Sequence, residues 1–76
     1  MGFLPVVSGK LLLRVLLRNG YVLLKSEGSH HALIHSDRPH IKIIIPVHGR
    51  RELKRGTLLN ILRSAEITPE QLKNML

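Results

Sequence analysis

The chain has 76 residues, a length that predicts one domain over residues 1–76 with a small hydrophobic core. Twelve Lys and Arg residues against five Asp and Glu residues give a formal net charge of +7, which favours a polyanionic partner, above all a nucleic acid. The sequence has no Cys, which excludes disulfides and thiolate metal sites. Phe3 and Tyr21 are its only aromatic residues, which argues against a base-stacking platform.

Neither a signal peptide nor a transmembrane helix is expected. The apolar stretch Met1–Val7 lacks the cationic region that begins a signal peptide. The longest leucine-rich run, Leu11–Leu17, contains Arg14, whereas a membrane span needs about 20 mostly apolar residues. We therefore expect a cytoplasmic protein with no membrane partner.

The first predicted element is a helix over about residues 9–19. Ser8 is a typical N-cap residue, and leucines recur after it at helical spacing. Asn19 and Gly20 favour the end of this helix, because Gly tolerates the left-handed conformation there.

Three short strands are expected next. The segments Tyr21–Glu27 and His30–His35 flank Gly28 and Ser29, a two-residue signal for a type II′ hairpin turn. After a polar loop, the isoleucine-rich segment His40–Ile45 predicts a third strand that ends at a proline.

The rest of the chain predicts a basic segment and two helices. Residues 47–56 are basic and irregular, and Thr57 is a candidate N-cap for the second helix. Thr68 and Gln71 form a capping box with Pro69 between them, which predicts a short helix from Pro69 to about Met75.

The resulting α-β-β-β-α order with a short C-terminal helix predicts an α+β fold in two layers with a three-stranded antiparallel sheet. This is the arrangement of a double-stranded-RNA-binding domain, although a fold alone does not define an activity. The predicted third strand carries isoleucines on both faces, and helices can cover only one. The uncovered face predicts a protein partner, either a different protein or a second copy of the chain.

Five segments together resemble the successive motifs of the HicA toxin family. They are Val6-Val7-Ser8-Gly9-Lys10, Asn19-Gly20-Tyr21, Gly28-Ser29-His30-His31, Ile45-Pro46-Val47-His48 and Lys54-Arg55-Gly56-Thr57-Leu58. Their order and spacing cover nearly the whole chain. Two positions depart from the family pattern: Leu11 replaces a frequent acidic residue, and Glu66 stands where relatives usually end the second helix with Gly.

The resemblance implies a fold like that of double-stranded-RNA-binding domains, ribosome-independent cleavage of messenger RNA, and neutralisation by a HicB-like antitoxin. It also implies that His30, which follows Gly-Ser, is the catalytic residue. Some members carry this histidine one position later, so His31 remains a second candidate.

Histidine suits RNA cleavage chemically, because imidazole exchanges protons near neutral pH. Successive strand residues face opposite sides of a sheet, so His30 and His31 cannot both face one scissile phosphate without a bulge. Gly28 allows close approach of an RNA backbone beside Ser29.

The candidate RNA-binding residues are mostly cationic. They are Gly28 and Ser29 of the turn, Lys25, His48, and the basic group Arg50, Arg51, Lys54 and Arg55. Neither a metal nor another cofactor is expected, because the sequence has no helical H-x₃-H and strand geometry distributes the histidines over two faces. Two other readings remain open: a non-catalytic RNA-binding module of the same fold, and a protein-interaction domain with a basic surface.

Overall fold

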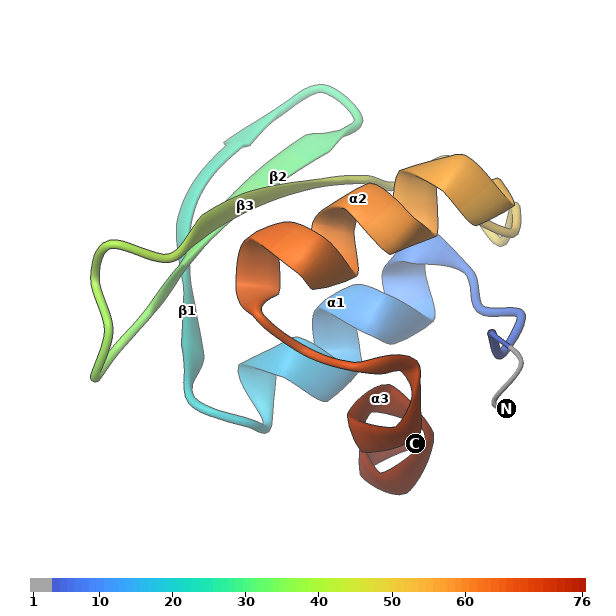
Figure 1. Cartoon of the computed structure of the whole chain (residues 1–76). Helices are drawn as coiled ribbons and strands as arrows, with labels where there is room; N and C mark the ends of the chain where they lie inside the picture. Colours follow the sequence, from blue (N-terminus) through green and yellow to red (C-terminus); the bar gives the residue numbers. More distant parts are fainter. Residues whose placement is uncertain (1–3) are drawn as a thin grey trace.

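The computed structural model describes residues 4–76, so Met1, Gly2 and Phe3 of the predicted domain lie outside the described residues. Its elements follow the predicted order (Figure 1). They are the helix α1 (Gly9–Leu17), the strands β1 (Tyr21–Glu27), β2 (His30–His35) and β3 (Lys42–Pro46), and the helices α2 (Arg55–Ala65) and α3 (Pro69–Met75). The predicted α+β class is confirmed.

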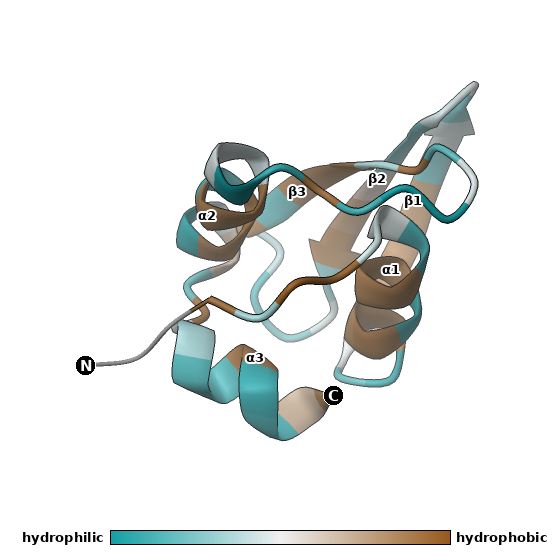
Figure 2. Cartoon of the chain, turned by 90° about the vertical axis from the view of Figure 1, so that its right-hand side faces the viewer, coloured by the Kyte–Doolittle hydropathy of each residue, from teal (hydrophilic) through white to brown (hydrophobic). Residues whose placement is uncertain are grey.

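The three strands form one antiparallel sheet in the order β1-β2-β3. Helices α1 and α2 lie against one face of this sheet, and α3 lies beyond them (Figure 1). Figure 2 shows that hydrophobic residues concentrate on α1, α2 and the strands, whereas the visible side of α3 is hydrophilic. The largest fully buried side chains come from every element except β1: Leu12, Leu16, Leu33, Ile41, Ile45, Leu58, Leu62 and Leu72.

Two predicted helix caps are confirmed. The Ser8 hydroxyl accepts a hydrogen bond from the Leu11 N–H at 3.0 Å, which satisfies one free donor of the first turn of α1. Thr68 and Gln71 make both hydrogen bonds of a capping box at the start of α3. Helix α1 ends at Leu17, two residues before the predicted end, and Gly20 has the positive φ of +88°.

Two predicted boundaries were wrong, one by two residues and the other by three. Strand β3 begins at Lys42 instead of His40, because residues 38–41 close a turn in which the Ile41 N–H donates to the Arg38 carbonyl at 2.9 Å. Helix α2 begins at Arg55, and Lys54 instead of Thr57 is its N-cap. The Leu53 N–H donates to the Val7 carbonyl at 2.9 Å, and this long-range contact fixes the segment just before the helix.

Candidate active site and nucleic-acid interface

The turn between β1 and β2 has the predicted geometry. Gly28 has a φ of +56°. The φ of Ser29 is not positive, because Glu66 is the single non-glycine residue with positive φ within residues 4–76. A positive φ at Gly28 but not at Ser29 is the pattern of a type II′ turn. A Cβ on Gly28 would meet no heavy atom within 4 Å, so the backbone of the turn is open to a ligand. The Ser29 carbonyl accepts a hydrogen bond from the Val47 N–H at 2.6 Å, which joins the turn to the end of β3.

His30 and His31 belong to opposite faces of the sheet. His30 is exposed and lies between Glu27 of β1 and Pro46 of β3 on the face turned away from the helices, called here the open face. His31 is half-buried on the helix-covered side, in register with the buried Ile45. The Nδ1 atom of His31 is buried and has no hydrogen-bond partner in the described part of the chain. Only His30 is therefore freely accessible from the open face.

A bulge at Leu24 brings Lys25 to the same face as His30. The register of β1 against β2 shifts between Leu23 and Lys25, so Lys25 pairs with Ala32 on the open face. Strict alternation from the buried Tyr21 would have placed Lys25 on the helix-covered face. Bulges of this kind re-aim a side chain and are frequent beside active sites.

His30 lies at a shallow hollow of about 80 Å³ in the open face, called here the His30 hollow. Its lining residues are Lys25, Glu27, His30, Ala32 and Ile44. Lys25 Nζ lies 2.8 Å from Glu27 Oε1, and both side chains are largely exposed. An imidazole, an ammonium group and a carboxylate therefore share one solvent-accessible site.

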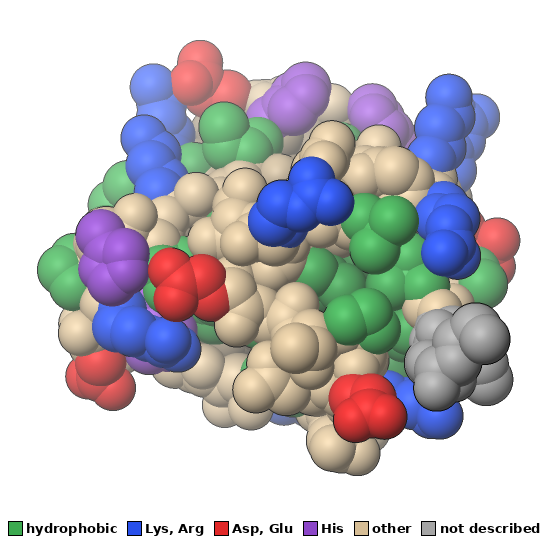
Figure 3. All heavy atoms as spheres, in the orientation of Figure 1, with side chains coloured by type: hydrophobic (Ala, Val, Ile, Leu, Met, Phe, Trp, Pro, Cys, Tyr) green, Lys and Arg blue, Asp and Glu red, His purple; other side chains and the backbone are tan. Residues whose placement is uncertain are grey.

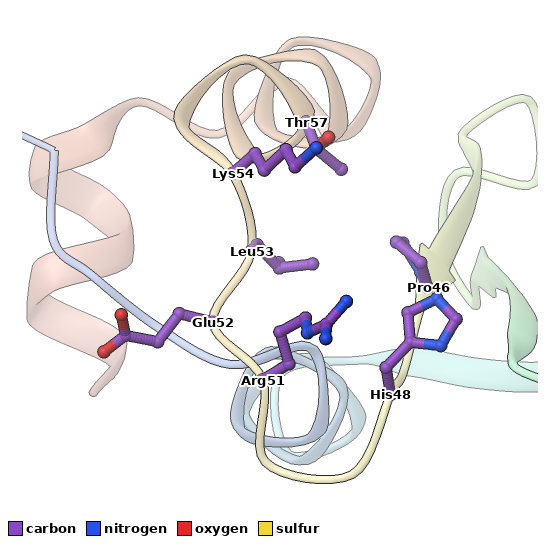
Figure 4. Close-up of a pocket in the computed structure, with 7 residues that line it drawn as sticks. All are labelled: Pro46, His48, Arg51, Glu52, Leu53, Lys54 and Thr57. Carbon is purple, nitrogen blue, oxygen red and sulfur yellow. The ribbon is translucent and has the colours of Figure 1, made fainter.

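A second hollow, of about 280 Å³, lies between the end of β3 and the start of α2 and is called here the basic hollow. Its lining residues are Pro46, His48, Arg51, Glu52, Leu53, Lys54 and Thr57. Figure 4 shows the Arg51 guanidinium and the Leu53 side chain directed into it and the His48 ring beside Pro46. The Glu52 carboxylate points away (Figure 4). The cations thus converge, and the acidic group of the lining does not face them.

The predicted basic group is only partly brought together. Arg51 and Lys54 line the basic hollow with His48. Arg50 is exposed in the preceding turn and lines neither hollow. Arg55 is part of α2, which corrects its predicted place in the irregular segment, and it lies with Leu4, Pro5 and Val6 on another surface. Figure 3 shows several Lys and Arg side chains at the end of the molecule where the β3–α2 segment runs, and others spread over the rest of the same face.

Two features of the site were missed by the sequence analysis. Glu27 faces His30 across the turn, and a two-residue hairpin loop could have predicted this pair, because it places its flanking residues opposite each other. The face of Lys25 depends on the bulge, for which the sequence gives no signal.

Other properties of the described residues bear on cofactors and membranes. Within residues 4–76, no three His, Asp or Glu side chains are grouped as ligands of a metal ion would be. In the same part of the chain, no helix is long and apolar enough to cross a membrane.

Comparison with known proteins identifies the family. A comparison with protein families matches residues 9–67 to the family described as the HicA toxin of bacterial toxin–antitoxin systems. A search of curated proteins finds no match. The matched region extends from the first residue of α1 to just beyond α2 and includes both hollows. The chain therefore belongs to the HicA toxin family of bacterial toxin–antitoxin systems.

Proposed function

We propose that this toxin is an endoribonuclease that cleaves messenger RNA without the ribosome and uses His30 as its catalytic residue. The observation that carries the proposal is an exposed imidazole beside an open glycine turn, in a hollow that also contains Lys25. The net charge of +7 supports an RNA substrate, because it favours a polyanion.

The chemistry requires three events at one phosphodiester. A base removes the proton of the ribose 2′-OH, cationic groups stabilise the charge on the phosphate, and an acid protonates the leaving 5′ oxygen. His30 can serve in one of these proton transfers, either as the base at the 2′-OH or as the acid at the 5′ oxygen. Such a role contributes roughly 10²–10⁴-fold in rate. The Lys25 ammonium group can stabilise the phosphate in the same hollow. Neither role needs a metal ion, so we expect RNA cleavage to continue in the presence of a metal chelator.

The family implies an antitoxin partner, and we propose that it is a HicB-like protein that inhibits by covering His30. The open face supports this, because Ile44 in the His30 hollow and Val22 farther along the same face are 54% and 50% exposed. Exposed apolar side chains of this kind are typical of a protein interface.

Incubation of a defined labelled transcript with purified protein in excess EDTA tests the proposal. We expect the wild type to cut the transcript and His30→Ala to leave it intact. His31→Ala should retain cleavage, because the His31 ring faces the helices. Circular dichroism melting curves would establish that both variants are folded. Undiminished cleavage by His30→Ala would reject His30 as the catalytic residue, and intact RNA with bound wild type would favour a non-catalytic RNA-binding module.

A further inference from the structure

We propose that the basic hollow binds the RNA phosphate next to the scissile phosphate, with Arg51 as its principal contact. This inference rests on the proposed function, and it adds a subsite to the centre at His30. An RNA strand would cross Pro46, with the scissile phosphate at the His30 hollow and a neighbouring phosphate in the basic hollow.

Pro46 is the structural link between the two hollows. It pairs with His30 in the sheet and also lines the basic hollow. The hydrogen bond from Val47 N–H to the Ser29 carbonyl fixes the chain just after Pro46 to the hairpin turn. Gly9 of α1 lies so close to the Pro46 carbonyl that a Cβ there would collide with it. The ridge between the two hollows is therefore held from both sides.

The cations of the basic hollow are available for a ligand. Within residues 4–76, no ion pair includes Arg51 or Lys54. The one carboxylate of the lining, Glu52, points away from the hollow (Figure 4). Uncompensated cations that converge on a cavity favour an anion, and the guanidinium of Arg51 suits a phosphate because it can donate two parallel hydrogen bonds.

The start of α2 adds to this preference for an anion. Lys54 is the N-cap and makes no side-chain capping hydrogen bond, and the first turn contains no acidic residue. Thr57, in that turn, lines the basic hollow. The positive end of the helix dipole therefore reinforces the charges of Arg51 and Lys54.

The contact between Arg51 and a neighbouring phosphate should be equally strong in the enzyme–substrate complex and in the transition state. Such a contact strengthens binding without accelerating the chemical step. Arg51→Ala should therefore raise KM and the Kd for RNA on the order of tenfold, since hydrogen bonds to charged groups are worth this much. The value of kcat should change little.

The test uses an RNA oligonucleotide that spans a cleavage site mapped in a transcript. Every ribose carries 2′-O-methyl, so the RNA is bound but not cut. The phosphates within two positions of the cleavage site are replaced one at a time by neutral methylphosphonate, and Kd is measured by fluorescence anisotropy. The proteins are the wild type, Arg51→Ala and Arg63→Ala, which loses the same charge in the last turn of α2.

For the wild type, we expect one neighbouring replacement to raise Kd about tenfold. Arg51→Ala should bind the unmodified RNA correspondingly more weakly and be insensitive to that replacement, whereas Arg63→Ala should behave like the wild type. Equal sensitivity in the wild type and Arg51→Ala, or sensitivity at no neighbouring phosphate, would overturn the subsite. A wild type that cuts the transcript but shows none of these sensitivities would overturn the subsite alone, whereas a wild type that cuts no transcript, so that no site can be mapped, would overturn the proposed cleavage.

Discussion

Tyr21 connects the start of the sheet to the end of α2. Its hydroxyl donates a hydrogen bond to the Ala65 carbonyl at 3.2 Å, and its ring meets the His35 ring edge-on at 4.8 Å between centroids. Burial raises the pKa of Tyr21 above its ordinary value of 10.0; Arg38 opposes this shift and Glu66 adds to it. The folded state therefore favours the neutral phenol.

The raised pKa predicts a loss of stability at alkaline pH. A phenol whose pKa is higher in the folded state stabilises the fold fully below its unfolded pKa, and this contribution falls as the pH rises above about 10. Urea unfolding at pH 8 and pH 11 should show a smaller alkaline loss in Tyr21→Phe than in the wild type. At pH 8 the variant should be less stable by about 1 kcal/mol, because the hydrogen bond is lost. An identical alkaline loss in both proteins would contradict this role of Tyr21.

Glu66 occupies a backbone conformation that suits glycine. It follows α2 with φ 59° and ψ 38°, in the left-handed region, which costs a residue with a Cβ roughly 1–2 kcal/mol. Its carboxylate lies 4.0 Å from Arg38 and 3.7 Å from His40, but all three side chains are at least half exposed. Ion pairs of this kind contribute little. Gly is the residue expected here from the family resemblance, and the left-handed conformation of Glu66 is the one that favours Gly.

We therefore predict that Glu66→Gly is more stable than Glu66→Ala by about 1 kcal/mol. Both variants lose the same ion pairs, so their difference reports the backbone alone. Thermal or urea unfolding of the two proteins measures it. Equal stability of the pair would show that the left-handed conformation carries no cost at this position.

At the scale of elements, the contact between α1 and β3 depends on Gly9. Its position leaves no space for a Cβ beside the Pro46 carbonyl, so Gly9→Ala must push α1 away from the end of β3. Overpacking of this kind costs about 1–3 kcal/mol, and we expect that loss of stability in urea unfolding. Gly56→Ala is the matched control, because a Cβ there meets nothing within 4 Å. That variant should be unchanged or up to about 1 kcal/mol more stable; the reverse order would contradict the packing of α1 on Pro46.

The sequence predicts elements well where the signals are local. The bounds of β1 and β2 and the cap of α3 were confirmed, because turn and capping residues act over two to four positions. The start of β3 was wrong because residues 38–41 close a local turn, and the start of α2 was wrong because the long-range hydrogen bond from Leu53 to Val7 overrides weak local preferences. The placement of His30 and His31 on opposite faces followed from alternation after the turn. The basic hollow could not be predicted, because it forms only when α2 packs beside the end of β3.

At the scale of the whole molecule, one face of the sheet is covered by helices and the other is open. Ile41, Ile43 and Ile45 are buried on the covered side, whereas Ile44 is 54% exposed, as the isoleucine pattern predicted. The net charge of +7 favours acidic partners for the open face, and two copies of the same chain would repel each other. This charge supports an antitoxin over a second copy as its protein partner.

In the proposed function, His30 transfers a proton and does not merely bind RNA. The most direct test compares the single-turnover cleavage rate of wild type and His30→Ala with their Kd for the uncleavable 2′-O-methyl RNA, at one salt concentration. We expect a nearly unchanged Kd and a cleavage rate lower by roughly 10²–10⁴-fold in the variant. A rate that falls only in proportion to affinity, or does not fall, would contradict it.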